Sequence, residues 1–281
     1  MTIHWCGTGL SAIPGLRKLI TDGHDLIVWN RTIEKAISTV GDITDSIKEF
    51  DIQKLERHLK KGDIVVSMLP GDWHVPIAKL CLKCHGHFIS SSYISAEMRE
   101  LHNSASETGL CLVNEVGLDP GIDHLMAHTL IEDYRNSKDQ DDENDISFIS
   151  YCGGIPKVKN PFCYKFSWSP LGVLKALKSP SRSIKDYKEF DARRPWNAIS
   201  TYTAPLPVPE EFEVYPNRDS LPFIDQYDLN ENWKIKEFVR GTLRPKGWKN
   251  AWSEIFSEIE KLSVENGDKR LVEISDKLWL E

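Results

Sequence analysis

The sequence lacks the features that would attach the chain to a membrane or to nucleic acid. Its apolar runs fall well short of the roughly 18 residues of a membrane-spanning helix, and no basic leader or apolar core marks a secretory signal before Ile3-His4-Trp5-Cys6-Gly7. Lys and Arg number 35 against 42 Asp and Glu, which gives a net charge of −7. Because no basic field covers the chain, we expect neither nucleic acid nor a membrane as its partner.

Cysteine is also scarce. Six cysteines scattered over 281 residues make no disulfide framework, so we expect reduced thiols and a cytoplasmic protein. Cys81-Leu82-Lys83-Cys84-His85, with His87 nearby, matches the C-x-x-C-H pattern of haem attachment. Covalent haem attachment needs an exported chain. We therefore interpret the run as helix thiols and a loop histidine, and expect no metal site.

A glycine-rich turn opens the chain, whose 40% hydrophobic and 27% charged residues are typical of a soluble globular protein. Gly7-Thr8-Gly9-Leu10-Ser11-Ala12 follows a strand predicted over residues 2–6 and precedes a predicted helix. This G-x-G-x-x-A run is a variant of the dinucleotide-binding fingerprint. Gly7 permits the tight turn, Gly9 lets the backbone approach a pyrophosphate, and Ala12 lets the helix pack on the strand.

The end of the second predicted strand, at 26–29, indicates which dinucleotide binds. Asn30-Arg31-Thr32 follows this strand without an acidic residue that would bond the ribose 2′-hydroxyl of NAD. An arginine at this place accepts the 2′-phosphate of NADP. We therefore predict NADP, with a solvated surface arginine as the alternative interpretation of Arg31.

Strands and helices then alternate up to residue 113, which predicts a doubly wound, parallel, Rossmann-type sheet and an α/β fold. One of the helices is expected over 96–108. Ligands bind beyond the carboxyl ends of such strands. That rule selects five stretches of this sequence: Gly7–Ala12, Asn30–Thr32, Leu69–Asp72, Ser91–Tyr93 and Glu115–Asp119.

The composition changes after residues 114–124. Within them, Asp119-Pro120-Gly121 has turn chemistry, and it is expected either to contact a ligand or to form an ordinary strand-to-helix turn. The acidic run 139–145 is predicted to be a solvated connector between domains, and 248–262 an amphipathic helix whose apolar stripe packs in a core.

Cationic side chains gather in this second half. We expect four of them in turns or at strand ends: Lys165, Arg218, Arg240 and Arg244. Guanidinium groups bind carboxylates bidentately, so a nucleotide-binding domain joined to these residues suggests a reductase of a carboxylate-rich substrate. Alternatively, each cation pairs with a surface acid.

Five motifs in order resemble the saccharopine dehydrogenase family of the L-glutamate-forming type. They are NEVGLDPGIDH (114–124), YCGGIP (151–156), YKFSWS (164–169), YPNRDS (215–220) and VRGTLR (239–244). The resemblance runs from about residue 3 to about residue 260. It implies a Rossmann domain, here 1–124, and a second α+β domain for substrate binding and dimerisation, here 125–281. It also implies a homodimer.

The resemblance further implies an activity in lysine metabolism. Saccharopine is oxidised by NADP at its secondary amine and hydrolysed to L-glutamate and 2-aminoadipate 6-semialdehyde, or the reverse reaction runs. Motif matching and strand-end position together give these cofactor-binding residues: Gly7, Gly9, Leu10, Ser11, Asn30, Arg31, Thr32, Leu69, Pro70, Leu118, Asp119, Pro120 and Ser169. The motifs and the charges give these substrate-binding residues: Ser92, Tyr93, Cys152, Lys165, Arg218, Gly241, Thr242, Leu243 and Arg244.

Proton transfer is expected from Asp119, Tyr93 or Cys152, or from water alone. His124 is expected to cap or pack at a helix start rather than act as a base. The family continues past the 248–262 helix with a tail that completes the substrate sheet, and this chain is expected to lack that tail. Two alternatives stand beside a saccharopine dehydrogenase. One is a related imine reductase, such as a carboxynorspermidine-forming enzyme, and the other is an NADP-binding module that the missing tail leaves without turnover.

Overall fold

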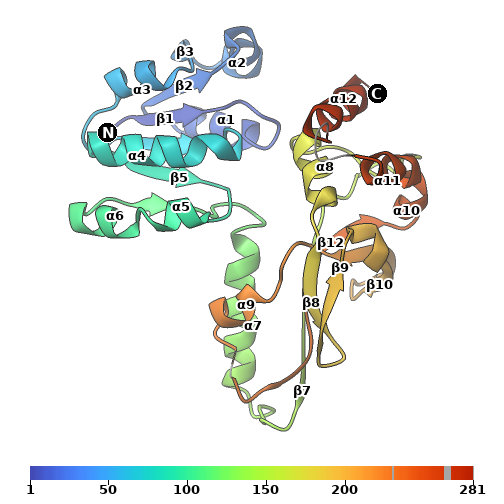
Figure 1. The fold of residues 1–281 in the computed structure, drawn as a ribbon. Helices are drawn as coiled ribbons and strands as arrows, with labels where there is room; N and C mark the ends of the chain where they lie inside the picture. The colour runs from blue at the N-terminus through green and yellow to red at the C-terminus, as the bar shows by residue number, and fades with distance from the viewer. Residues whose placement is uncertain (230, 263–266, 281) are drawn as a thin grey trace. The chain divides into compact units, whose positions relative to one another are not determined.

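The computed structural model describes residues 1–229, 231–262 and 267–280, and the chain divides into two compact units, Met1–Ile122 and Asp123–Glu281 (Figure 1). In the described residues no helix is long and apolar enough to cross a membrane.

The first unit is a six-stranded parallel sheet in the order β3-β2-β1-β4-β5-β6, flanked by helices. Its strands are β1 Ile3–Cys6, β2 Leu26–Asn30, β3 Ile47–Glu49, β4 Ile64–Ser67, β5 His87–Ser90 and β6 Leu112–Val113. Its helices are α1 Ile13–Thr21, α2 Ile33–Val40, α3 Ile52–His58, the 3-10 turn η1 Gly71–Trp73, α4 His74–Cys84, α5 Ala96–Arg99 and α6 His102–Thr108. This order confirms the predicted doubly wound sheet. The single helix expected over 96–108 is instead two helices, α5 and α6.

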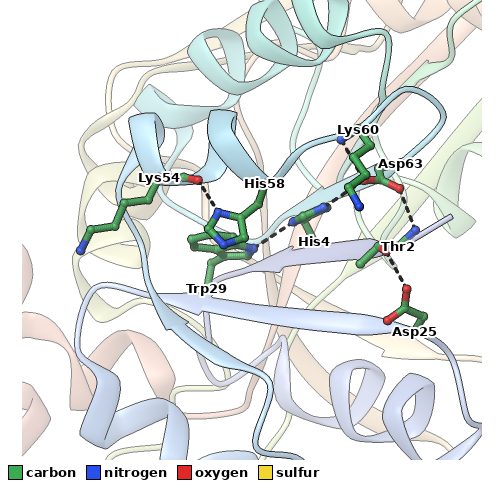
Figure 2. Close-up of polar contacts among 8 residues, drawn as sticks. All are labelled: Thr2, His4, Asp25, Trp29, Lys54, His58, Lys60 and Asp63. Carbon is green, nitrogen blue, oxygen red and sulfur yellow. Dashed lines mark hydrogen bonds and ion pairs between the residues drawn. The ribbon is translucent and has the colours of Figure 1, made fainter.

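Buried polar groups hold the amino end of this sheet together (Figure 2). The Asp63 carboxylate, just before β4, accepts hydrogen bonds from the backbone N–H groups of Thr2 at 2.8 Å and Lys60 at 2.9 Å. Nε2 of His4, on β1, lies 3.3 Å from the same carboxylate. Nδ1 of His4 accepts from the indole N–H of Trp29 at 3.1 Å. Because the indole is a donor only, His4 carries its ring proton on Nε2 and donates it to Asp63.

The second unit is an α+β domain built on a mostly antiparallel sheet. The strand order is β10-β11-β12-β8-β9, and β7 pairs with β12 in parallel. Its strands are β7 Asp145–Cys152, β8 Ser181–Lys185, β9 Lys188–Ala192, β10 Ser200–Ala204, β11 Glu210–Pro216 and β12 Lys234–Pro245. Its helices are α7 Ile122–Arg135, α8 Pro170–Lys178, the 3-10 turn η2 Pro195–Ala198, α9 Pro222–Gln226, α10 Trp248–Ala251, α11 Ser253–Glu260 and α12 Gly267–Leu280.

Two expectations for this unit are wrong. The acidic run 139–145 lies between α7 and β7, inside the second unit, and does not connect the two units. The helix expected over 248–262 breaks at Trp252, where α10 ends and α11 begins. The apolar stripe is core as predicted, because Trp248, Trp252 and Ile259 are fully buried.

Candidate functional site

The glycine-rich turn after β1 has the geometry of a phosphate-binding loop. Gly7 has φ +106°, and a Cβ there would stand 2.8 Å from the carbonyl oxygen of Met68, so only glycine fits. The next N–H, of Thr8, donates to Oδ1 of Asn30 at 3.2 Å. Oγ1 of Thr8 is buried with no hydrogen-bond partner in the described part of the chain. An orphaned hydroxyl in this loop fits a site built for a polar ligand.

Asn30, at the end of β2, and Arg31, which follows it, have different surroundings. Asn30 is 8% exposed, and its amide donates to the carbonyl of Thr32 at 2.7 Å, so it holds this turn in shape. Arg31 is exposed and makes no ion pair or hydrogen bond within the described residues. A guanidinium beside the glycine-rich turn suits the 2′-phosphate of NADP. The residues present therefore fit this cofactor.

Other predicted cofactor residues line the same carboxyl edge of the first sheet. Leu10 and Ser11 are exposed on the turn before α1, and Leu69 and Pro70 lie in the loop after β4. In the turn after β6, the Asp119–Pro120 peptide bond is cis and Leu118 is 65% exposed.

The hydroxyl of Tyr93 donates to Oδ1 of Asp119 at 2.6 Å, which joins two of the predicted catalytic residues. Tyr93 lies in the loop after β5 and Asp119 in the loop after β6, and β5 and β6 are neighbouring strands. The backbone ties the two loops together, since Glu115 N–H donates to the Ser92 carbonyl at 3.1 Å. A carboxylate paired with a phenol at a sheet edge can accept and return a proton.

His74, at the start of α4, was not predicted as a site residue. Its ring bridges Ser67 Oγ, at 3.0 Å, and Ser92 Oγ, at 2.8 Å, and Ser92 is a predicted substrate contact. The signal available in the sequence was its place: a histidine shortly after a buried strand stands at the ligand-binding edge.

In the second unit, strand β12 carries four of the predicted substrate residues, Gly241, Thr242, Leu243 and Arg244, on alternating faces. Arg240, Thr242 and Arg244 alternate along the strand and therefore point to the same side. Cys152, at the end of β7, pairs with Thr242 in register. Arg244 is the next-to-last residue of β12, as expected for a strand end, whereas Arg240 lies inside this 12-residue strand, so that expectation is wrong for Arg240. Gly241 and Leu243 face the other side.

Arg244 and Arg240 are both 7% exposed, but their surroundings differ. The Arg244 guanidinium lies over the rings of Tyr164, Trp248 and Tyr215, with Cζ 4.9, 5.4 and 5.7 Å from their centroids. It meets no carboxylate among the described residues, and its Nε is buried without a partner there. Arg240 instead forms an ion pair with Asp123 and lies over the Phe223 ring at 3.9 Å.

Lys165, Arg218 and Ser169 lie at the surface of the second unit, whereas His124 is packed. Lys165 is exposed and makes no ion pair in the described chain, whereas Arg218 is exposed on a turn with φ +57°. Ser169 caps α8, because its Oγ accepts from the N–H of Gly172 at 3.2 Å. His124 packs as expected: its ring stacks on Phe223, and Nδ1 lies 2.8 Å from the Tyr227 hydroxyl.

The C-x-x-C-H run has the structure of an ordinary helix end. Cys81 is fully buried, which raises the pKa of its thiol to about 12, and His85 ends α4 in the left-handed conformation. Within the described residues, no three His, Cys, Asp or Glu side chains gather as metal ligands.

Comparisons with known proteins give both halves of the chain the same assignment. Residues 3–113 match the family model of the saccharopine dehydrogenase NADP binding domain, and residues 117–278 match that of the saccharopine dehydrogenase C-terminal domain. The first unit is therefore an NADP-binding domain, which confirms the predicted cofactor.

Individual relatives agree. Saccharopine dehydrogenase (NADP(+), L-glutamate-forming) of Pyricularia oryzae is 35% identical over 250 residues, 86% of this chain and 54% of that protein. Alpha-aminoadipic semialdehyde synthase of Arabidopsis thaliana is 34% identical over 251 residues, 86% of this chain and 23% of that protein. The solved apo saccharopine dehydrogenase (L-Glu forming) of Saccharomyces cerevisiae has a TM-score of 0.74 and 32% identity, over 88% of this chain and 56% of that one.

The chain thus spans 54% of the length of the Pyricularia relative and less of the Arabidopsis one. The two family models together cover nearly all of this chain, from residue 3 to residue 278. The chain belongs to the saccharopine dehydrogenase family.

Proposed function

We propose that this protein is an NADP-dependent oxidoreductase acting on the CH–NH group of saccharopine in lysine metabolism. It would give L-glutamate and 2-aminoadipate 6-semialdehyde, or catalyse the reverse reaction. The observation that carries the proposal is the 2.6 Å hydrogen bond between Tyr93 and Asp119 at the carboxyl edge of the NADP-binding sheet. The 35% identity to an enzyme of that name supports it.

NADP, when bound, supplies the acceptor for a hydride. The hydride leaves the carbon that becomes the aldehyde, and a proton leaves the secondary amine, so a C=N bond forms. We assign that proton to Asp119, and the hydrogen bond from Tyr93 supports this choice. Water then adds to the C=N carbon, and the nitrogen stays with glutamate. Cys152 is the further candidate for proton transfer, unless water alone serves.

We propose the first domain, 1–124, for NADP and the second, 125–281, for substrate. Saccharopine is rich in carboxylates, which suits the cations Lys165, Arg218 and Arg244. Arg244 is the best prepared of these, because its guanidinium is buried without a carboxylate among the described residues. The other proposed contacts are Ser92, Gly241, Thr242 and Leu243.

The direct test is the near-ultraviolet absorbance of NADPH when purified protein is mixed with saccharopine and either NADP or NAD. Growth of the signal with NADP supports the proposal. A flat trace, with NADP binding intact by calorimetry, would contradict it and leave a different imine substrate or a binding module without turnover.

We also propose a cytoplasmic homodimer. The exposed apolar residues of α7, among them Leu125, Met126 and Leu130 at 59–69% exposure, offer a surface for association. Sedimentation equilibrium would decide the oligomeric state, and a monomer at all concentrations would contradict the dimer. Cell fractionation would test the compartment.

A further inference from the structure

His74 joins two serines at the carboxyl edge of the NADP-binding sheet. Ser67, the last residue of β4, is fully buried, and His74 is 6% exposed. Ser67 Oγ lies 3.0 Å from Nδ1 of His74, and Nε2 of the same ring lies 2.8 Å from Ser92 Oγ. The three side chains therefore form one hydrogen-bonded chain from the sheet interior to the loop after β5.

Burial of Ser67 determines which groups donate and which accept in this row of hydrogen bonds. Its hydroxyl has a single hydrogen-bond partner among the described residues, the ring of His74. A buried donor without a partner is rarer than an oxygen with a spare lone pair. The Ser67 hydroxyl therefore donates to Nδ1, and His74 carries its proton on Nε2. Burial also lowers the pKa of His74, which keeps the ring neutral and Nδ1 able to accept.

The Nε2 proton in turn sets the role of Ser92. Ser92 Oγ accepts from Nε2, so its own proton is left to donate outward. The backbone holds this residue in place, because Ser92 N–H donates to Ser90 Oγ at 3.3 Å and the Ser92 carbonyl accepts from Glu115 N–H at 3.1 Å. Ser92 is half-buried and can reach a ligand. A fixed hydroxyl proton suits a carboxylate oxygen, which only accepts, better than an ammonium group, which only donates and would find a single remaining lone pair on Oγ.

We propose, resting on the function proposed above, that His74 is a positioning residue that commits the Ser92 hydroxyl to a substrate carboxylate. The Ser67–His74–Ser92 relay then favours an imine substrate with a carboxylate at this place over one with an amine. It selects saccharopine against a carboxynorspermidine-type substrate.

Kinetics of matched variants test the relay. His74→Leu removes the donor to Ser92, and His74→Gln places an amide N–H near the position of Nε2. We expect KM for saccharopine to rise about tenfold in His74→Leu, the effect of one hydrogen bond to a charged group, with a smaller rise in His74→Gln. NADP affinity should stay unchanged in both. His102→Leu, at an exposed position of α6, is the control.

Two kinetic outcomes would overturn the proposal. One is an unchanged KM in His74→Leu. The other is a parallel loss of NADP affinity that His74→Gln fails to restore, because a merely structural role predicts that result. Ser67→Ala keeps the histidine and serves if the His74 variants do not fold. It should raise KM in the same direction.

The histidine tautomer gives a readout that does not need turnover. In protein labelled with ¹⁵N at histidine, we expect His74 to show the Nε2–H tautomer at neutral pH, and Ser67→Ala to lose that preference. Glutarate should bind the NADP-loaded protein more tightly than cadaverine does, and His74→Leu should reduce that difference. An Nδ1–H tautomer, or equal binding of the two probes, would refute the relay. If the tautomer and the probe binding are as expected but saccharopine is not turned over, only the proposed substrate is refuted.

Discussion

The hydroxyl of Tyr93 donates a 2.6 Å hydrogen bond to the carboxylate of Asp119. The two residues follow neighbouring parallel strands, and the backbone bond from Glu115 N–H to the Ser92 carbonyl couples their loops. A short phenol–carboxylate bond orients both groups and lets them share a proton. This pairing joins two separate sequence candidates into one hydrogen-bonded unit.

Separating the two members of that unit should impair turnover. We expect Tyr93→Phe and Asp119→Asn each to lower kcat about 10²-fold to 10⁴-fold, the range for losing one general acid–base group. The double variant should be little worse than the poorer single one, because residues that act together are not additive. Steady-state kinetics with saccharopine measures both effects. Tyr187→Phe, at an exposed position between β8 and β9, is the control, and additive losses would contradict a shared role.

The ion pair between Arg240 and Asp123 should matter more for stability than for binding. Both side chains are under a tenth exposed, and removing one partner of such a pair leaves the other charge buried. We expect Asp123→Asn to lower the free energy of unfolding by about 3–5 kcal/mol in denaturant titrations. The matched control is Asp22→Asn, whose partner Lys18 is exposed, and it should change stability little. Equal effects of the two variants would show that burial of the Arg240 pair is unimportant.

The sequence predicted the first unit better than the second. Runs such as Ile64–Ser67 are apolar and bounded by turns, so strand and helix alternation was visible in residues 1–113. In the second unit β9 and β10 are edge strands with few apolar residues, Lys188–Ala192 and Ser200–Ala204, and they carry no such signal. Their pairing depends on contacts with distant strands, which local patterns do not show.

The site was predictable where the chain itself carries the chemistry. The Gly7–Ala12 turn and Arg31 act through local backbone and charge, and the structure places them at the predicted edge. By contrast, the ring of aromatic side chains around Arg244 comes from three segments, with Tyr164, Tyr215 and Trp248 far apart in sequence. No local pattern distinguishes a buried arginine of this kind from a surface one.

The His4–Asp63 pair should make the NADP-binding domain sensitive to acid (Figure 2). Burial lowers the pKa of His4 from 6.5, although the hydrogen bond to Asp63 opposes it. Burial acts to raise the pKa of Asp63, but the hydrogen bonds from Thr2, Lys60 and His4 outweigh it and lower the pKa from 3.8. For both groups the unfolded chain binds protons at a higher pH than the folded one does, so stability falls as pH decreases.

The His4 contribution to stability is complete above pH 6.5 and is lost as pH falls from there toward the folded pKa; the Asp63 contribution is lost only below pH 3.8. We expect denaturant midpoints to decline between about pH 7 and pH 5, and His4→Asn to flatten that decline. His24→Asn, at an exposed position, should leave the slope unchanged. If the denaturant midpoint declines with pH equally in His4→Asn and in the wild type, groups other than His4 cause the acid sensitivity.

Gly241 should tolerate no side chain. A Cβ there would stand 2.6 Å both from the Tyr151 ring and from the carbonyl oxygen of Tyr215. The ring can rotate away only by disturbing its contact with Tyr202, and the carbonyl belongs to the sheet. We expect Gly241→Ala to lower the free energy of unfolding by more than about 2 kcal/mol, as overpacking does. Gly71→Ala, with open space around its Cβ, is the control, and comparable melting temperatures would contradict the steric argument.

Arg31 should determine the choice of cofactor. It is exposed after β2 and makes no ion pair with any residue that the structure describes, so its guanidinium is available for the 2′-phosphate. A charge-assisted hydrogen bond contributes about 1.5–3 kcal/mol, so Arg31→Ala should weaken NADP binding by about 10-fold to 150-fold. NAD lacks the 2′-phosphate, so its affinity should change little. Calorimetry with both dinucleotides measures the ratio. Arg57→Ala, on α3, is the matched loss of one positive charge, and an equal effect there would reduce the role of Arg31 to general electrostatics.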